Sequence, residues 1–208
     1  MRPRRIVVVT GTGTEVGKTW VAARLASAIR AQRLTVAVRK PAQSFAAGDD
    51  MTDAHVLGAA SSEAPELVCP PHRWYPVPMA PPMAAAELGL EPPSLEDLIA
   101  EVDRSWPASD VDLGIVEAAG GVASPQAADG DATDLARALK ADRVLLVADA
   151  VLGTINAVRL SVWALAPIPV TVFLNRYDGS DGLHRANRDW LRVRDGFEVI
   201  ASVDQLVV

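Results

Sequence analysis

Residues 11–19 read Gly11-Thr12-Gly13-Thr14-Glu15-Val16-Gly17-Lys18-Thr19, directly after the β-branched run 6–9 and before a helical pattern. A glycine-rich loop between a buried strand and a helix is the context that a phosphate-binding P-loop requires. Glycines let backbone N–H groups approach a polyphosphate, the helix N-terminus adds a positive dipole, and Lys18 neutralises the terminal phosphates. Thr19 would then supply a hydroxyl ligand for Mg²⁺. The stretch therefore predicts a nucleoside triphosphate site, and the alternative is a glycine-rich turn that matches by chance.

The rest of the chain alternates short apolar runs with helical patterns. Apolar runs that predict buried parallel strands lie at 6–9, 35–38, 112–116, 143–147 and 170–174. Helical spacing is found at 17–32, 133–139 and 154–165. Strands that alternate with helices imply right-handed crossovers and a sheet covered on both faces. The pattern predicts an α/β fold with a doubly wound, mostly parallel sheet of the P-loop NTPase type.

Length and charge limit the classes of protein to which the chain can belong. With 208 residues it is long enough for one buried α/β core, and we expect a single domain over residues 1–208. A net charge of −6 without a clustered basic face argues against a nucleic-acid binder. The apolar runs are far shorter than the roughly 20 residues of a membrane span, and no signal-peptide pattern is found. The single cysteine, Cys69, cannot form an internal disulfide, so we expect a cytoplasmic protein.

A proline-rich segment interrupts the alternation of strands and helices. Residues 65–93 hold nine of the fifteen prolines, so we expect an excursion from the sheet there, near the substrate site. Short pieces of structure are expected at 66–68 and 83–88. Ser94 and Asp97 then stand at the spacing of a capping box, which predicts that a helix begins at this point.

The spacing of the glycine loop points to one family. Five residues separate Gly11 from Gly17, one more than in the common P-loop. The loop resembles the variant P-loop of dethiobiotin synthetases, and three later segments resemble that family's motifs in the same order. By this resemblance, the ATP-binding residues of the loop are Thr14, Glu15, Val16, Gly17, Lys18, Thr19 and Trp20.

The first later segment, 39–44, follows the second expected strand, at the edge where open parallel sheets bind ligands. It resembles the family's K-P-x-x-S/T motif. The resemblance implies that Lys40, together with Lys18, stabilises the carbamate and the γ-phosphate during transfer, and that Ser44 contacts the substrate. The alternative for Lys40 is a surface lysine beside a turn-forming proline. Phe45 stands where the family often has glycine, so we expect it to alter the pocket.

The second segment, 52–55, resembles the family's S/T-D-A motif, in which the aspartate completes a magnesium site. This implies that Asp53 is a metal ligand, with Asp49 and Asp50 as alternative ligands. Asp53 could instead be the N-cap of a short helix. We expect His55 to be an ordinary exposed residue.

The third segment, 116–121, places Glu117 between a buried strand and a glycine turn and resembles the family's V-E-G-A-G-G motif. The predicted magnesium ligands are Thr19, Asp53 and Glu117. The predicted nucleotide contacts of this segment are Glu117, Ala118, Ala119 and Gly120. Because Ala118 replaces a glycine of the motif, we expect backbone strain or a narrowed site there if the loop needs a positive φ.

Weaker matches follow along the chain. Residues 75–81 resemble the family's proline-bearing substrate loop, and 152–156 resemble an L-G-x-I-N segment that implies a substrate contact by Asn156 near a dimer interface. Asn175 resembles an asparagine that reads adenine, although an asparagine that ends a strand is also ordinary turn chemistry. The family's G-x-I-P nucleotide loop is not found in 199–208, so we expect weaker or less base-selective nucleotide binding.

The resemblance implies an ATP- and Mg²⁺-dependent ligase of biotin biosynthesis. It would close a cyclic urea from the diamine 7,8-diaminononanoate and CO₂ through a phosphorylated carbamate, and it would act as a homodimer. One alternative is a diverged P-loop ligase with another substrate, and a second is a nucleotide-binding paralogue without catalysis. A third is a partitioning-type ATPase, but residues 12–16 lack the lysine that those proteins carry early in the loop.

Overall fold

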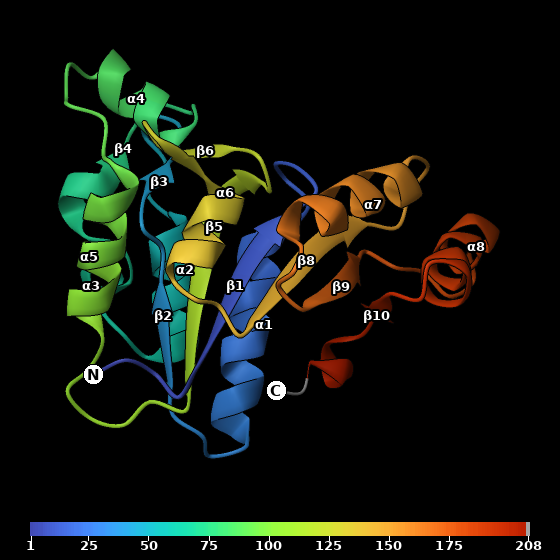
Figure 1. The fold of residues 1–208 in the computed structure, drawn as a ribbon. Helices are drawn as coiled ribbons and strands as arrows, with labels where there is room; N and C mark the ends of the chain where they lie inside the picture. The colour runs from blue at the N-terminus through green and yellow to red at the C-terminus, as the bar shows by residue number, and fades with distance from the viewer. Residues whose placement is uncertain (207–208) are drawn as a thin grey trace.

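The computed structural model of the chain describes residues 1–206, and its centre is a six-stranded parallel sheet (Figure 1). The spatial order is β10-β9-β8-β1-β5-β2, and every neighbouring pair is parallel. The strands are β1 (Arg5–Gly11), β2 (Val36–Arg39), β5 (Leu113–Gly121), β8 (Arg143–Asp149), β9 (Val170–Asn175) and β10 (Glu198–Ile200). Continuous apolar runs form such strands because both faces of the sheet are covered.

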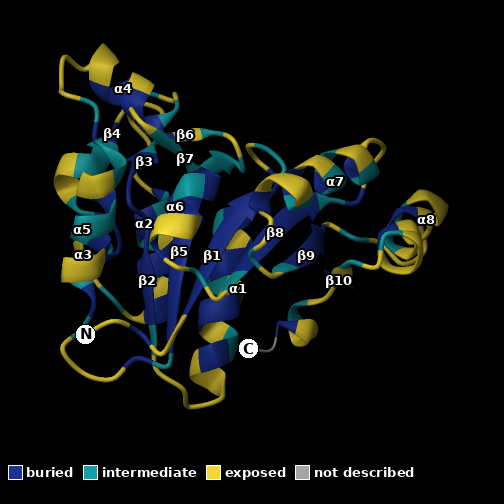
Figure 2. Cartoon of the chain, viewed as in Figure 1, coloured by how far each residue is buried: buried dark blue, intermediate teal, exposed yellow. Residues whose placement is uncertain are grey.

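Helices cover both faces of the sheet. Side chains alternate along β1, so Val7 and Val9 pack in the core with α1 and α2, whereas Ile6 and Val8 pack with α5 and α6. Helix α7 packs on β8 and β9 in a third cluster. These helices are α1 (Lys18–Ala31), α2 (Asp53–Ser61), α5 (Leu95–Ser105), α6 (Ala132–Ala138) and α7 (Thr154–Leu165). Figure 2 shows the buried strands between helices whose outer faces are exposed.

The predicted fold class is confirmed, and most predicted elements lie within two residues of their expected bounds, except that β5 continues to Gly121. The predicted helix 154–165 coincides with α7. The later elements β10 and α8 (Gly182–Asp189) were among those not predicted. Both are short, and α8 is mostly exposed at the edge of the molecule (Figure 2), so neither carries a long apolar pattern.

The proline-rich excursion leaves the sheet after β2 and returns to it at β5. Within residues 65–93 it holds short helices, as expected for 66–68 and 83–88, and one short strand. These elements are α3 (Pro65–Val68), β4 (Trp74–Tyr75) and α4 (Pro81–Glu87), and β4 pairs with β3 (Gln43–Ser44), which lies before residue 65. Helix α5 begins where predicted, because the Ser94 hydroxyl accepts from the backbone N–H of Asp97 and the Asp97 carboxylate accepts from the N–H of Ser94.

A small antiparallel pair, β6 (Pro125–Ala127) and β7 (Gly130–Asp131), follows β5 and leads into α6. Among residues 1–206 no helix is long and apolar enough to cross a membrane. The carboxyl ends of the parallel strands face β3, β4, α4 and β6 (Figure 1). The candidate site lies between these elements and the sheet.

Candidate active site

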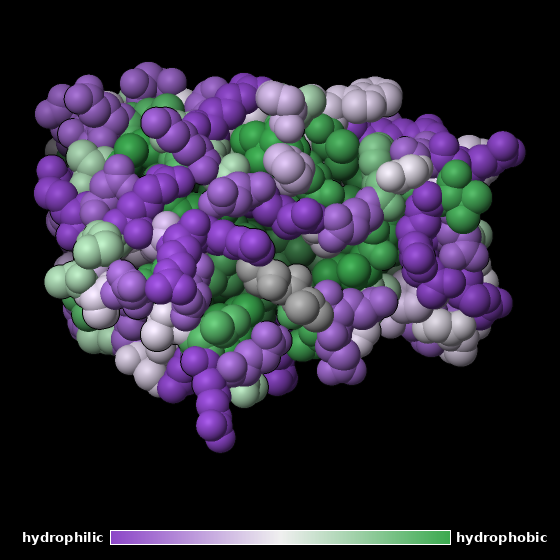
Figure 3. Space-filling view, turned by 60° about the horizontal axis from the view of Figure 1, so that its bottom comes forward, coloured by the Kyte–Doolittle hydropathy of each residue, from purple (hydrophilic) through white to green (hydrophobic). Residues whose placement is uncertain are grey.

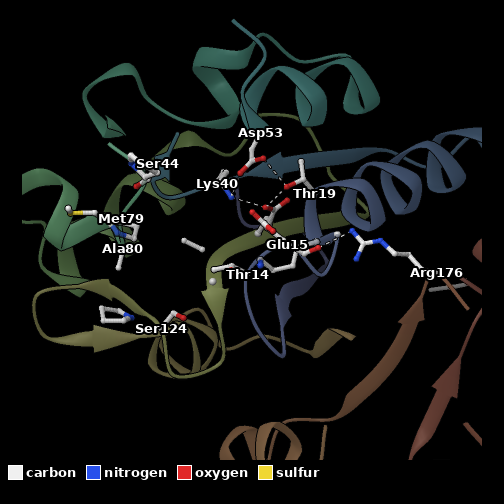
Figure 4. A pocket seen from close by; sticks show the side chains of 18 residues that line it. Thr14, Glu15, Thr19, Lys40, Ser44, Asp53, Met79, Ala80, Ser124 and Arg176 are labelled. Carbon is white, nitrogen blue, oxygen red and sulfur yellow. Dashed lines mark hydrogen bonds and ion pairs between the residues drawn. The ribbon is translucent and has the colours of Figure 1, made fainter. Parts of the chain in front are cut away.

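A cavity of about 820 Å³ lies at the carboxyl edge of the sheet, between the glycine loop and the excursion (Figure 4). Open parallel sheets bind ligands at this edge. Figure 4 shows Lys40, Asp53 and Thr19 close together, with Met79 and Ala80 across the pocket. Predicted site residues that line the cavity are Thr14, Glu15, Gly17, Lys18, Thr19, Lys40, Ser44, Asp53, Glu117, Ala119 and Gly120.

The glycine loop adopts a conformation that its sequence favours. Gly17, the residue before α1, has φ +91°, and a Cβ there would collide with the carboxamide of Asn175. A Cβ on Gly11 would lie 2.7 Å from the Val16 side chain, so this position also requires glycine. The Lys18 Nζ donates to the backbone oxygen of Gly13 at 2.8 Å, which holds the lysine over the loop.

Lys40 lies at the centre of a buried charge cluster. Its Nζ is 2.7 Å from Glu117 Oε1 and 2.9 Å from Asp53 Oδ2. The Thr19 hydroxyl lies 3.0 Å from Asp53 Oδ1 and 2.9 Å from Glu117 Oε1. Lys40 is 3% exposed and Glu117 is 1% exposed, so the interpretation of Lys40 as a surface lysine is wrong. Charges this deeply buried need close partners, and here each has one.

The environment shifts the pKa values of these groups in different directions. Attraction from Lys40 lowers the pKa of Asp53. Burial raises the pKa of Glu117 despite the nearby ammonium group. Burial also lowers the pKa of Lys18, whereas for Lys40 the attraction of two carboxylates outweighs burial and raises its pKa. Lys40 therefore stays charged, and Asp53 stays ionised, at neutral pH.

The same cluster fits a magnesium ion. Mg²⁺ prefers hard oxygen ligands and few protein carboxylates, and Thr19, Asp53 and Glu117 offer a hydroxyl and two carboxylates. Glu117 Oε2 is buried and finds no hydrogen-bond partner among residues 1–206, which leaves one carboxylate oxygen unsatisfied. Asp49 and Asp50 are exposed and do not line the cavity, so the structure favours Asp53 over these alternatives.

The start of α2 explains the roles of the residues around Asp53. Thr52, not Asp53, is the N-cap, and His55 completes a capping box by accepting from the Thr52 N–H at 3.3 Å. The His55 ring also packs edge-on against Trp74, with ring centroids 5.5 Å apart. His55 is therefore half-buried and structural, so the expectation of an ordinary exposed residue is wrong.

The segment after Glu117 differs from its expected form. Ala118 is fully buried in β5 and is not among the residues with positive φ, so the expected backbone strain is not found. Gly120 is the residue with φ +65°. The Ala119 N–H already donates to Gln126 Oε1 at 2.8 Å, so this amide is paired within the protein rather than free for a phosphate.

A second cavity of about 540 Å³ adjoins the first at the N-terminus of α1. Trp20 and Asn175 line it, together with Tyr177, Ala201 and Val203. The Asn175 Nδ2 donates to the backbone oxygen of Val16 at 2.9 Å, and Val16 itself is buried. Residues after β10 thus flank this cavity, although the segment 199–208 lacks the family's nucleotide-loop motif. Val207 and Val208, at the end of that segment, lie outside the described residues.

Two expectations about the pocket are not met in the single chain. Asn156 lies on α7 in a separate cavity with Leu152 and Trp163, away from Lys40. Phe45 does not line the cavity that contains Ser44, so the expectation that it alters this pocket is not met.

Sequence reasoning missed three residues that line the main cavity, namely Ser124, Pro125 and Arg176. Ser124 accepts from the Gly121 N–H at 2.8 Å and fixes the turn after β5. The position of Arg176 directly after Asn175 was the only available signal for it. Residues 78–81 form the opposite wall, within the segment that matched the family's substrate loop.

The opposite edge of the sheet carries a different surface. Figure 3 brings the bottom of Figure 1 forward and shows hydrophilic residues with hydrophobic ones between them. A cavity of about 400 Å³ involves Arg5, Asp142, Arg143 and Glu198, and the Arg143 guanidinium pairs with Glu198 at 2.6 Å. Nowhere in residues 1–206 do three or more His, Cys, Asp or Glu side chains form a metal-binding cluster. The charge cluster at the carboxyl edge, where Lys40 and two carboxylates line the main cavity with the phosphate-loop residues, is the candidate site.

The sequence is similar to known proteins over most of its length. Residues 5–207 match a family model described as an AAA domain. The chain is 38% identical over 206 residues to the ATP-dependent dethiobiotin synthetase BioD of Rhodococcus jostii (strain RHA1), covering 95% of this chain and 85% of that protein. It is 40% identical over 157 residues to the protein of the same name from Streptomyces avermitilis, covering 75% and 63% of the two chains.

Solved structures of low sequence identity share the fold. The signal recognition particle receptor FtsY from Elizabethkingia anophelis aligns with a TM-score of 0.56 at 15% identity, covering 100% of this chain and 63% of that one. A plasmid partition protein from Borrelia burgdorferi B31, bound to AMPPNP, aligns with a TM-score of 0.55 at 10% identity, covering 97% and 88%. At such identities the likeness concerns the fold alone.

Proposed function

The chain belongs to the dethiobiotin synthetase family, and on this premise we propose that its site closes the cyclic urea of dethiobiotin from 7,8-diaminononanoate, CO₂ and ATP. One observation carries the proposal: a buried lysine, Lys40, bridges two carboxylates beside the hydroxyl of the phosphate loop. A cation at this place lies where negative charge gathers during phosphoryl transfer.

The reaction proceeds through anions, and the chain's own groups account for their binding. One amine of the diamine adds to CO₂ and loses a proton, which gives a carbamate. A carbamate oxygen then attacks the γ-phosphorus of ATP as the bond to ADP breaks. The second amine attacks the carbamate carbon and loses a proton, and phosphate leaves, which closes the urea ring. Lys18 and Lys40 line one cavity and neutralise the carbamate and the transferring phosphoryl group in that cavity.

Thr19, Asp53 and Glu117 are the residues that we propose to hold Mg²⁺, which when bound offsets phosphate charge and orients the γ-phosphoryl group. The fixed geometry of these side chains supports this role, because the Thr19 hydroxyl lies within 3.0 Å of both carboxylates. Ser44 lines the same cavity, and its Oγ is buried without a hydrogen-bond partner among residues 1–206. An unsatisfied hydroxyl at this place is suited to a polar substrate group, such as an amine or a carbamate.

We propose that the second cavity, at the N-terminus of α1, binds the base of the nucleotide. Trp20 offers an exposed indole beside it, and Asn175 contributes a carboxamide. Few polar side chains line this cavity, so we propose that stacking contributes more than hydrogen bonding to base recognition.

The proposal is tested by incubating the protein with ATP, MgCl₂, bicarbonate and 7,8-diaminononanoate and searching for dethiobiotin by mass spectrometry. We expect product that depends on all four components, and ADP release that depends on the diamine. Release of ADP with another diamine or diacid but not with this one would instead identify a diverged ligase. ATP binding by calorimetry without any turnover would identify a paralogue that has lost catalysis.

A homodimer and a cytoplasmic location are also part of the proposal. Helix α7 and the loop before it expose several apolar side chains, of which Leu152 is 84% and Trp163 is 66% exposed. Such a patch is typical of an interface. In the proposed dimer Asn156 of one subunit would approach the substrate tail in the other. Sedimentation of Leu152→Asp should show monomer, whereas Leu67→Asp on α3 should sediment as wild type, and an unchanged L152D would exclude this interface.

A further inference from the structure

One residue of the glycine loop, Glu15, lies in a conformation that needs support. Glu15 has φ +59°, in the left-handed region that side-chain-bearing residues rarely adopt. Glycine would take this φ without a steric cost, but the chain has glutamate here. Glu15 is exposed, so packing in the core does not hold its backbone.

Two consecutive side chains from the end of β9 donate to two consecutive carbonyls of the loop. The Arg176 Nη2 donates to the backbone oxygen of Glu15 at 3.0 Å. The Asn175 Nδ2 donates to the backbone oxygen of Val16 at 2.9 Å. The loop is therefore held at Glu15 and Val16 by residues about 160 positions later in the sequence.

The Arg176 guanidinium is itself held from a third element. Its Nη1 lies 2.8 Å from Asp149 Oδ1 at the end of β8. Arg176 also has a positive φ, +54°, which turns the chain sharply after β9. Figure 4 shows the arginine reaching the loop from the side opposite to Lys40 and Asp53.

We propose that Arg176 is a positioning residue for the phosphate loop: by donating to the Glu15 carbonyl it holds Glu15 in its left-handed conformation, and so keeps the loop in the shape that binds the polyphosphate. The inference rests on the proposed nucleotide site, but not on which substrate is phosphorylated. It assigns a role in nucleotide affinity to Arg176, a residue that lies outside the P-loop sequence.

The first test measures ATP binding by calorimetry with excess MgCl₂ for Arg176→Met, Arg176→Lys and the control Arg192→Met. Arg192 is exposed and lines neither of the two cavities that Arg176 lines. We expect R176M to raise the Kd for ATP about tenfold, the equivalent of one net hydrogen bond of about 1.4 kcal/mol. R176K should recover part of the affinity, and R192M should match wild type. In turnover, the KM for ATP should rise while the KM for the diamine stays unchanged.

A second test separates support of the loop from direct contact with the nucleotide. In an E15G background the loop has no left-handed strain to be offset, so adding R176M should raise the Kd by less than about threefold. An equal tenfold cost in both backgrounds would overturn the proposal, because the guanidinium would then act on the nucleotide itself. A wild-type Kd for R176M would also overturn it. Both results are read from binding alone, so they stand even if no dethiobiotin is formed.

Discussion

Replacing Lys40 by methionine should reduce both activity and stability, and the stability loss should depend on pH. The change removes the ammonium group that lies 2.7 Å from Glu117 and 2.9 Å from Asp53 while it keeps the length of the side chain. Loss of one preorganised charge near the transferring group should lower kcat about 10²- to 10³-fold. Because Asp53 is 40% exposed, water can solvate its charge, so the stability loss falls on the buried Glu117.

The stability loss has an upper limit, because Glu117 can take up a proton and so lose its buried negative charge. Protonating a carboxyl of ordinary pKa near 4.3 at pH 7.3 costs about 4 kcal/mol, and at pH 5.3 about 1.4 kcal/mol. In the variant the pKa of Glu117 is raised further in the folded state, so this state binds a proton that the unfolded state has released. Stability relative to wild type then falls as pH rises from the ordinary pKa towards the raised one.

The assay is urea unfolding of K40M and wild type at pH 5.3 and pH 7.3, with a chelator and without nucleotide. We expect K40M to be less stable than wild type by up to about 4 kcal/mol at pH 7.3 and up to about 1.4 kcal/mol at pH 5.3. Lys140→Met, at an exposed lysine, is the matched control and should change stability by less than about 0.5 kcal/mol at either pH. A K40M loss that is the same at both pH values would refute the buried-carboxylate reasoning.

Three further outcomes are expected. Gly17→Ala should lose about 2–3 kcal/mol in urea unfolding, because its φ is +91° and its Cβ would displace Asn175, whereas Gly13→Ala, with open space around its Cβ, should change stability little; equal losses would contradict this. Glu117→Gln should raise the Mg²⁺ concentration for half-maximal turnover at least about tenfold in a MgCl₂ titration, and an unchanged titration would remove Glu117 from the metal site. Burial raises the pKa of Cys69 to about 12, so the native thiol should react with a disulfide reagent at pH 8 only after unfolding, and rapid labelling of the native protein would show that the thiol is accessible.

The parts of the fold with local patterns could be predicted from the sequence. The glycine loop and α1 follow from residues that are adjacent in the chain, and α7 has the bounds that its 3.6-residue period indicates. β10 could not be found in this way, because three residues are too few to show a period.

The site was partly predictable for a different reason. Lys40 follows the last residue of β2, and Glu117 lies beside it within the neighbouring parallel strand β5, so their proximity follows from topology although 77 positions separate them. Their burial and hydrogen bonds depend on long-range packing and could not be predicted. The same holds for Ala118, whose ordinary φ is a property of the extended β5, and for Arg176, which has no pattern around it.

The wall formed by residues 78–81 has an evolutionary consequence. It belongs to an excursion that shares no hydrogen-bonded strand with the six-stranded sheet, so substitutions there need not disturb strand register or the glycine loop. A lineage could therefore alter which small molecule it accepts while inheriting its phosphate chemistry intact. Directed libraries confined to this short stretch would be the economical route to new acceptors.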